Sequence, residues 1–474
     1  MIHTRQIIVK PNDEYFTYFD EITKATTKLY NTTLCRLKQV MTAMRHDPEE
    51  WTNREQAIMQ EITDALPDMN EQYGFDGSIR PRFTMPTPED WLLKYNFMYA
   101  LFRVTKNPDF CTKALPSQVA QNVVYAACKN MKRYAEAKNK GTDFHLPKYL
   151  HGTRRHRANF PTQATKYKVD NNGRTYLQFP RTKLKFYLKP IDCGVYKLAR
   201  VFVKYQYGVF YVSVTLDDHL PAPQTIDNPQ RICAIDIGVN NLAAITNNVG
   251  EPCLLFKGGI IKSANNLYNK QLISMRKSHC LNDKYVIKHL PEYQKATIRR
   301  NNLIRDFMYK VSKMIIEWCV GHDIDTIVVG NMRRKLTEMQ TDCEYKSFFV
   351  PIPFDTLRKQ LQFKAAASGI KFIEVDESYT SQASFLDGDE IPCENEPAVF
   401  SGFRGPTSYK GTTNYYGLQG LYQTADGTIV NADLNASANI GHKAYPTVFN
   451  KDTVSISDGV IIIKHPDGTI YSTK

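Results

Sequence analysis

An acidic side chain at the end of an apolar stretch is the first candidate for chemistry in this sequence. Asp236 follows the apolar residues 232–235, and the chain then turns at Gly238. An ionised carboxylate in such a place is costly to desolvate unless water, a positive side chain or a metal ion meets it. Metal ligation is therefore one interpretation. The other is that Asp236 accepts backbone N–H bonds from the turn over residues 238–241.

Two more acids follow later elements of the chain. Glu377 comes after a strand predicted at 371–375, and Asp433 enters the last predicted helix. Each has a simpler explanation: Glu377 could be one of several solvated acids at a strand end, and Asp433 could be a helix N-cap. Their joint placement favours a site, because parallel strands bring their carboxyl ends to one edge of a sheet. Three converging carboxylates predict a divalent-metal site, and two Mg²⁺ ions ~4 Å apart can hydrolyse a phosphodiester.

The hydrophobic pattern predicts the elements that must position these acids. From residue 231 onward, short apolar runs alternate with amphipathic segments, which predicts parallel strands joined by helical crossovers. Strands are expected at 232–236, 242–246, 253–257, 326–329 and 371–375, and helices at 293–320 and 354–368.

The N-terminal half has a different pattern. A short alternating strand at 4–9 precedes a long helical region over 14–140, interrupted by an irregular stretch at 67–90. Strand-like segments then dominate residues 141–216. Because the strand at 4–9 stands alone before the helices, we expect it to pair with the later sheet, which makes the helical bundle an insertion.

The chain is thus predicted to be a multidomain α+β protein. Residues 1–12 would supply the first strand of a small β-barrel, 13–140 an inserted helical bundle, and 141–228 the rest of the barrel. Residues 229–474 would form an α/β domain with an insertion at 384–430.

Composition narrows the partners. The 474 residues include 61 Lys and Arg against 48 Asp and Glu, a formal charge of +13 that suits a polyanion, with nucleic acid the leading candidate. Ten cysteines without a Cys-x-x-Cys pair fit reduced thiols rather than a disulfide framework. No apolar secretory core and no run near ~20 apolar residues is present, so we expect no membrane association and a cytoplasmic location, at the bacterial nucleoid when bound to DNA.

Four segments in order resemble the RuvC-type nuclease motifs of the transposon-encoded TnpB (OrfB-type) family, from which compact type V CRISPR effectors descend. They read AIDIGVNNLAAI, TIVVGNMRRK, EVDESYTSQASFLDGD and VNADLNASANIGHKA. Further similar segments, LYNTTLCRLKQVMTA, LPSQVAQNVVYAACKNMKRYAEA and KSANNLYNKQLISMRKS, extend the resemblance to nearly the whole chain. The resemblance implies an RNA-guided DNA endonuclease with an RNase H-like (RuvC) nuclease domain, a wedge β-barrel and a helical recognition domain. A nuclease-dead, RNA-guided repressor and, less favoured, a DNA transposase are the alternatives.

The resemblance also implies the catalytic residues. Asp236 matches the first catalytic aspartate and Asp433 the last. Many relatives carry the middle glutamate directly after the strand that matches 326–329, where this chain has Gly330. A branch of the family carries it in the later segment, so Glu377 is assigned, and Mg²⁺, or Mn²⁺ as a substitute, is expected on all three acids. Two other glutamates remain candidates for the middle position, Glu338 and Glu374.

The inserted segment departs from the family pattern. Relatives commonly place a zinc ribbon between the last two catalytic acids, whereas residues 378–432 contain only Cys393 and no histidine. Four zinc ligands cannot be assembled from this segment, so no zinc is expected. The insertion is predicted to be a metal-free loop module that binds target nucleic acid.

The resemblance finally implies nucleic-acid partners. These are a guide RNA, either an omega-type RNA or a crRNA with its tracrRNA, and a target double-stranded DNA with a short motif that the protein reads. A monomer on its RNA is the favoured assembly. Basic clusters with aromatic neighbours are the candidate contacts, namely Lys148, Tyr149, Arg154, Arg155, Arg157, Arg299, Arg300, Arg333, Arg334 and Lys335.

Overall fold

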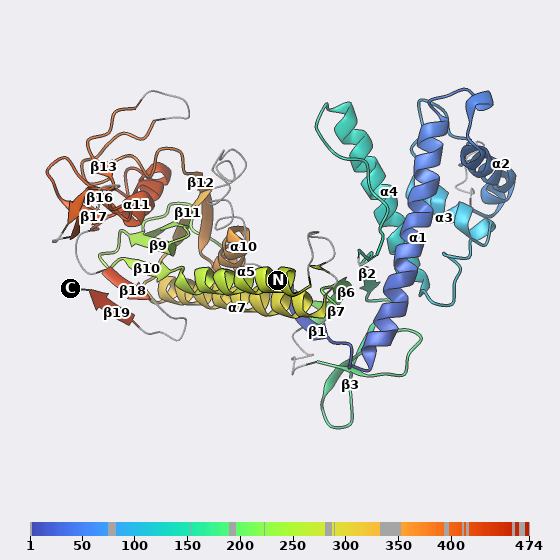
Figure 1. The fold of residues 1–474 in the computed structure, drawn as a ribbon, viewed down its shortest axis with the longest axis horizontal. Coiled ribbons are helices and arrows are strands. Elements are labelled where there is room, and N and C mark those ends of the chain that lie inside the picture. The colour runs from blue at the N-terminus through green and yellow to red at the C-terminus, as the bar shows by residue number, and fades with distance from the viewer. Residues whose placement is uncertain are drawn as a thin grey trace. The chain divides into compact units, whose positions relative to one another are not determined.

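The computed structural model divides the chain into two compact units, Met1–Leu220 and Pro221–Lys474 (Figure 1). The described residues are 2–73, 82–152, 154–188, 196–221, 223–279, 287–288, 290–331, 352–392, 398–409, 412–413, 417–456, 460–463 and 470–473. None of the helices in these ranges is both long and apolar enough to cross a bilayer.

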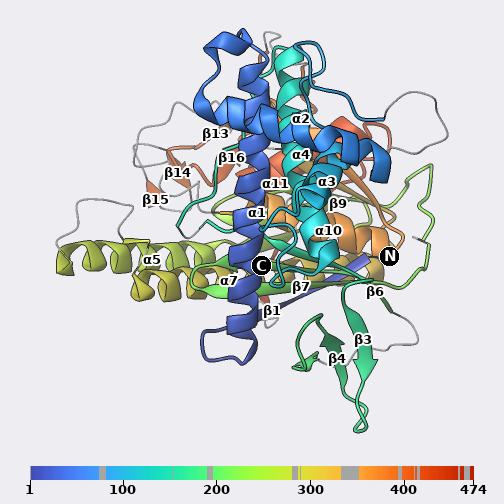
Figure 2. The ribbon, with the colours of Figure 1, turned by 90° about the vertical axis from the view of Figure 1, so that its right-hand side faces the viewer.

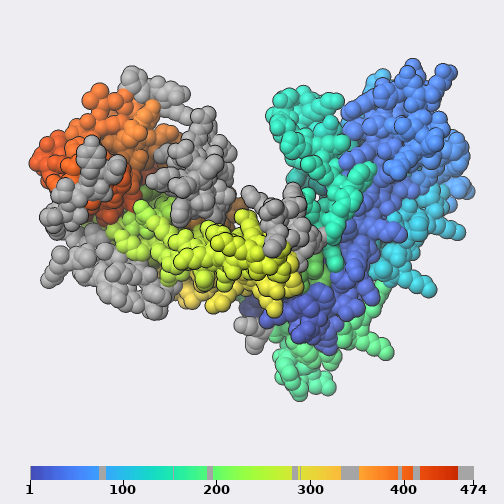
Figure 3. Space-filling view, viewed as in Figure 1, coloured from blue at the N-terminus to red at the C-terminus, as the bar shows by residue number. Residues whose placement is uncertain are grey.

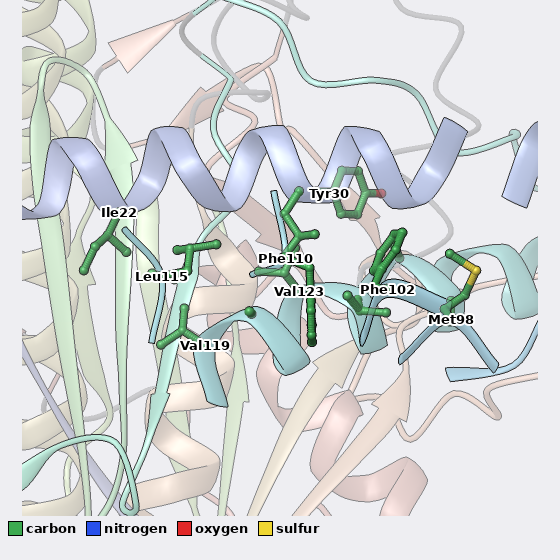
Figure 4. Close-up of a cluster of buried hydrophobic side chains, with 14 of the residues drawn as sticks. Ile22, Tyr30, Met98, Phe102, Phe110, Leu115, Val119 and Val123 are labelled. Atoms are coloured by element: carbon green, nitrogen blue, oxygen red, sulfur yellow. The ribbon is translucent and has the colours of Figure 1, made fainter. Parts of the chain in front are cut away.

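Four amphipathic helices form the bundle of the first unit. Their buried side chains recur every three or four residues, so each helix turns one apolar face to the others. Figure 4 shows such residues of α1 facing residues of the later helices across the core. The bounds are α1 (Tyr15–Ala43), α2 (Asn53–Tyr73), α3 (Tyr95–Val104) and α4 (Ser117–Asn139), with a 3₁₀ turn at Pro48–Glu50.

One prediction in this region is wrong. The irregular stretch expected from residue 67 does not begin there, because α2 runs through Pro67 to Tyr73. Proline removes one helical hydrogen bond, but Ile62, Ala65 and Met69 are buried on the inner face of α2, and this packing outweighs the loss.

The strand before the bundle belongs to the sheet after it. β1 (Ile2–Val9) pairs antiparallel with β7 (Val209–Asp217), from Ile2 opposite Asp217 to Val9 opposite Phe210. The four-stranded sheet has the order β1-β7-β6-β2, with β6 (Lys197–Gln206) and β2 (Ala158–Pro161). A second sheet, visible as a projection in Figure 2, contains β3 (Lys166–Val169), β4 (Thr175–Gln178) and β5 (Phe186–Tyr187).

Helices and sheets of this unit share one core. On α1, the ring of Phe19 lies 5.9 Å from that of Phe210 in β7 and 5.3 Å from that of Phe179. The bundle therefore folds against the sheet that flanks it in sequence.

A seven-stranded sheet organises the second unit, in the order β12-β11-β8-β9-β10-β18-β19. The first five strands along the chain stand in the order third, second, first, fourth, fifth, and the second is antiparallel to its neighbours. This is the topology of an RNase H-like domain, as predicted. The strands are β8 (Ile232–Asp236), β9 (Asn241–Asn247), β10 (Leu254–Lys257), β11 (Thr326–Asn331), β12 (Lys371–Asp376), β18 (Val460–Ile463) and β19 (Ile470–Thr473).

Helices cover both faces of this sheet. Cys233 and Ile235 of β8 join the core beneath α7, whereas Ile232 and Ala234 join the core beneath α11. Successive strand residues point to opposite faces, so residues of β8 with even numbers face α11. Helices α5 and α7, whose side chains form a continuous surface in Figure 3, belong to the first face together with α10. The bounds are α5 (Gly259–Ser278), α7 (Pro291–Gly321), α10 (Phe354–Ala367) and α11 (Ala432–Ala444).

The insertion before α11 contains more regular structure than the predicted loop module. Three short strands pair antiparallel in the order β13-β16-β17, and the last of them leads directly into α11. Their bounds are β13 (Phe403–Arg404), β16 (Leu421–Gln423) and β17 (Ile429–Asn431). In a separate two-stranded sheet, β14 (Ser408–Tyr409) pairs antiparallel with β15 (Thr412–Thr413).

Candidate active site

Asp236 ends β8 on the side of the sheet that α11 covers. Alternate residues of a strand share one face, so Asp236 lies on the same face as Ile232 and Ala234, whose side chains pack in the α11 core. Asp236 is half-buried. Beside it runs β11 in parallel, with Val329 opposite Ile235. The next residue of β11, Gly330, therefore lies next to Asp236 at the carboxyl ends of both strands.

Helix α11 brings Asp433 to the same place. Ser437 Oγ lies 2.9 Å from the carbonyl oxygen of Ala234, to which it donates, and Asn241 Nδ2 donates to Asp433 Oδ2 over 2.7 Å. Four residues of helix rise about 6 Å, which is close to the ~6.6 Å that two residues of strand span. One helical turn before Ser437, Asp433 consequently reaches the end of β8, where Asp236 lies.

The N-cap of α11 is not Asp433. Asn431 Oδ1 accepts the backbone N–H groups of Asp433, at 3.0 Å, and of Leu434, at 3.2 Å. The simpler explanation for Asp433 is therefore wrong. Its carboxylate instead receives side-chain donors: Arg404 Nη2 lies 2.9 Å from Oδ1, and Asn241 holds Oδ2.

Glu377 occupies the space that a side chain at residue 330 would fill. A Cβ atom on Gly330 would lie 2.6 Å from Glu377 Cγ and 2.8 Å from Cδ. Val328 packs in the α11 core, so Gly330, two residues later, also faces α11. The buried carboxyl group of Glu377, whose residue is 7% exposed, thus lies on the face that carries Asp236 and Asp433.

The other two candidates for the middle acid are placed differently. Glu374 stands opposite Val329 in the ladder, and Val329 packs in the core beneath α7 and α10. Its Oε2 lies 3.9 Å from Nη1 of Arg358 on α10, so Glu374 points away from Asp433. Glu338 lies outside the described residues.

Buried amides on α11 fix the loop that follows Glu377. Asn435 donates to the carbonyl of Ala383 over 2.8 Å and accepts the N–H of Phe385 at 3.0 Å. Asn439 donates to the carbonyls of Thr380, at 2.9 Å, and Ala383, at 2.7 Å. Both asparagines are at most 1% exposed. One helix therefore carries Asp433 and also anchors the loop of the middle acid.

Sequence reasoning missed these anchoring residues, although a signal was present. Asn435, Ser437 and Asn439 alternate with alanines in a helix that is otherwise small and apolar. Amides and hydroxyls buried in such a helix need partners outside it, which predicts contacts with neighbouring backbone.

The donor set suits a hard divalent cation, since all three candidate ligands are carboxylates on one face of the sheet edge. Within the described residues, however, no three acidic, histidine or cysteine side chains are gathered closely enough to hold a metal ion. Like charges repel one another in such a cluster, and Arg404 neutralises Asp433. The backbone thus brings the three acids together, whereas their side chains are not assembled into a metal cluster.

A basic groove of about 720 Å³ lies in the first unit, between α4, β6 and the segment 150–159. Arg157 and Arg200 both stack their guanidinium groups on Phe202, at 5.0 and 5.6 Å from its ring centre. No acidic side chain is among the described residues that line the groove, and its cationic side chains are Lys129, Arg133, Arg155, Arg157, Arg200 and Lys204.

The predicted nucleic-acid contacts are divided among several places. Arg155 and Arg157 line the groove, and Arg155 also pairs with Asp20. Lys148, Tyr149 and Arg154 precede or adjoin these residues without lining it. In the second unit Arg299 is exposed on α7, and Arg300 donates to Asn265 over 2.7 Å. The remaining three, Arg333, Arg334 and Lys335, lie outside the described residues.

Two family models match separate parts of the chain. The model of probable transposases of the OrfB_IS605 type matches residues 211–336. The model of the Cas12f1-like TNB domain matches residues 354–440. The first range contains Asp236, and the second contains Glu377 and Asp433. A search of curated proteins returns no match.

Several solved structures match this chain at low sequence identity. A Cas12f1–sgRNA–target DNA complex is 12% identical, with 90% of this chain and 82% of that chain covered and a TM-score of 0.46. A CRISPR-Cas12f ternary complex is 13% identical, with 96% and 82% covered and a TM-score of 0.31. Alicyclobacillus acidoterrestris C2c1 with its single-guide RNA is 9% identical, with 90% and 70% covered and a TM-score of 0.32.

Proposed function

We propose that this chain is an RNA-guided DNA endonuclease of the TnpB type, because separate parts of it match the models of OrfB_IS605-type probable transposases and of the Cas12f1-like TNB domain. In this proposal a bound guide RNA, of omega type or a crRNA with its tracrRNA, pairs with target DNA beside a short motif that the protein reads. One RuvC-like site then hydrolyses the phosphodiester bonds of the DNA.

A single observation carries this proposal. Asp236, Glu377 and Asp433 come from three distant parts of the chain, and their backbone positions meet on one face at the edge of an RNase H-like sheet. A parallel sheet offers its reactive groups at this edge. The role of middle acid falls to Glu377 rather than Glu374, since Glu374 faces the opposite side of the sheet.

The three carboxylates would be the ligands of Mg²⁺, or of Mn²⁺ in its place. When bound, a pair of such ions supplies an activated water and stabilises the leaving oxygen of the phosphodiester. In the absence of a bound cation, Arg404 neutralises Asp433 Oδ1, and Asn241 orients Oδ2. The side chain of Arg404 would give up its contact when a divalent cation reaches Asp433.

The basic groove supports a nucleic-acid partner. Six cationic side chains and the ring of Phe202 line it. Cations bind phosphates, and the guanidinium planes that stack on the Phe202 ring offer faces on which a base can stack. We assign the groove to the nucleic acid that the first unit holds.

Copurifying RNA tests the proposal. The chain would be expressed with the DNA that flanks its gene, and the RNA that purifies with it would be sequenced. We expect one defined RNA, and Mg²⁺-dependent cleavage of DNA only where the DNA matches the variable part of that RNA. DNA bearing a scrambled match is the control.

Three outcomes would contradict the proposal. Binding of matched DNA without cleavage would indicate the nuclease-dead repressor. Transfer of free DNA ends without any RNA would indicate a transposase. Cleavage that ignores the RNA sequence would indicate an unguided nuclease.

A further inference from the structure

Two different side chains contact the two carboxylate oxygens of Asp433. Arg404 contacts Oδ1 from the insertion, whereas Asn241, at the start of β9, contacts Oδ2. Asn241 is itself held, because Lys257 Nζ lies 2.8 Å from its Oδ1. A series of hydrogen bonds from Lys257 through Asn241 to Asp433 therefore connects the end of β10 with the candidate metal site.

The chemistry of the groups fixes the direction of each hydrogen bond in this series. An ammonium group has only donors, so the end of the Asn241 amide that meets Lys257 must be its oxygen. The amide nitrogen then faces Asp433 and donates to the carboxylate. Without Lys257, the amide could turn over and present its oxygen to Asp433, which would repel it.

A β-bulge between β9 and β10 makes this series of hydrogen bonds possible. Lys257 stands opposite Asn241, but the preceding pair is Phe256 with Ala243, so β9 has one extra residue here. Ala243 and Leu242 both pack in the core beneath α7, which shows that the alternation of faces breaks at this point. Asn241 is thereby turned to the α11 face, and bulges commonly re-aim side chains in this way.

We propose that Lys257 is a positioning residue of the metal site, which acts through Asn241 to hold the Asp433 carboxylate in its ligating orientation. The inference depends on the proposed function, since it assumes that Asp433 binds a divalent cation. Residues that hydrogen-bond to metal ligands orient them, and their loss lowers metal affinity by roughly 10–100-fold.

Electrostatics alone predicts the opposite effect. Lys257 is a positive charge near the site, so its removal would tighten the binding of a cation if charge were its only contribution. Lys262 provides a matched control. Its ammonium donates to Asn240 Oδ1, one residue from Asn241 in the same turn, and this contact does not lead to Asp433.

Mn²⁺ binding to the purified full-length chain, measured by electron paramagnetic resonance, tests the inference. Asp433→Asn serves as the variant without the site. We expect Lys257→Met to weaken Mn²⁺ binding by roughly 10-fold, Lys257→Arg to restore most of it, and Lys262→Met to leave it unchanged or tighter. In an Asn241→Leu background, Lys257→Met should add no further loss, because the two residues act in series.

Other outcomes overturn the inference in distinguishable ways. Unchanged or tighter Mn²⁺ binding in Lys257→Met would overturn the role of Lys257 alone. An equal loss in Lys257→Met with and without Asn241→Leu would show that Lys257 acts by another route. A wild-type chain whose Mn²⁺ binding does not depend on Asp433 would overturn the proposed metal site and this inference with it.

Discussion

The carboxyl group of Glu377 lies directly over Gly330, in the space that a side chain at position 330 would occupy. Residue 330 lies near the end of β11, at the point where the resemblance to TnpB proteins places the middle glutamate of many relatives. In this chain the glycine leaves that space empty, and an acid from 47 positions later in the sequence fills it. The backbone of residue 330 and the carboxylate of Glu377 are thus far apart in the sequence but lie at the same place in the structure.

A methyl group at residue 330 should displace Glu377. Gly330→Ala would place a Cβ atom within 2.6 Å of Glu377 Cγ, so the glutamate must move. We expect cleavage of matched DNA to fall at least about 100-fold, because a displacement near 1 Å has that effect on catalysis, while guided DNA binding persists. The control is Gly321→Ala, where an added Cβ meets no atom within 4 Å. Equal cleavage by both variants would remove Glu377 from the site.

The two glutamates near the end of β12 should respond differently to loss of charge. Glu377→Gln is expected to reduce cleavage to background, since it removes a metal-binding charge. Glu374→Gln is expected to keep cleavage within a few-fold of wild type, since Glu374 faces Arg358 on the other side of the sheet. Initial rates on one matched DNA would be compared. If the effects were reversed, Glu374 would be the middle acid.

Much of this site follows from sequence pattern. Asp236, Glu377 and Asp433 stand at the ends or beginnings of strongly patterned elements, so periodicity and the order of strands suffice to bring them to one sheet edge. The contact of Glu377 with Gly330 could not be predicted, because it depends on how the loop after β12 folds back. That loop is held by Asn435 and Asn439, and their partners are backbone groups, whose positions leave no mark in a sequence.

Other structural features could not be predicted from the sequence, for different reasons. The bulge that turns Asn241 toward Asp433 is a shift of one residue in a strand that is buried throughout, so no alternation of buried and exposed residues reveals it. The path of α2 through Pro67 reflects burial that overrides local propensity. The strands of the insertion are two or three residues long and give no periodic signal.

The basic groove should contribute binding that depends on salt. Lys204→Gln removes one charge that is free to meet a phosphate. We expect weaker nucleic-acid binding and a salt slope that falls by about one. Lys132→Gln is the matched control, since Lys132 lies outside the groove and pairs with Glu136 over 3.6 Å. Fluorescence anisotropy at several salt concentrations measures both. Identical slopes for the two variants would exclude the groove.

His156 should make folding stability depend on pH. It stacks on Tyr30, with ring centres 4.8 Å apart, and burial together with the nearby Arg157 lowers the pKa of its imidazole to about 4. The unfolded chain binds a proton near pH 6.5, which the folded chain does not. Stability therefore falls as pH drops from 6.5 toward 4, by about 3 kcal/mol at most from this group.

The measurement is urea unfolding at pH 7 and pH 5 for wild type and His156→Phe, which keeps the ring but cannot be protonated. We expect the variant to lose less stability between the two pH values. The same pH dependence in both proteins would show that His156 is not the responsible group.

The most direct test of the central claim uses Asp236, which ends β8 on the face that Asp433 reaches. Asp236→Ala would be purified with its copurifying RNA and compared with wild type on one matched DNA in Mg²⁺, with DNA binding measured on the same samples. We predict that cleavage disappears while RNA-guided binding keeps its affinity. Cleavage that persists in Asp236→Ala would contradict the assignment of these carboxylates as the nuclease site.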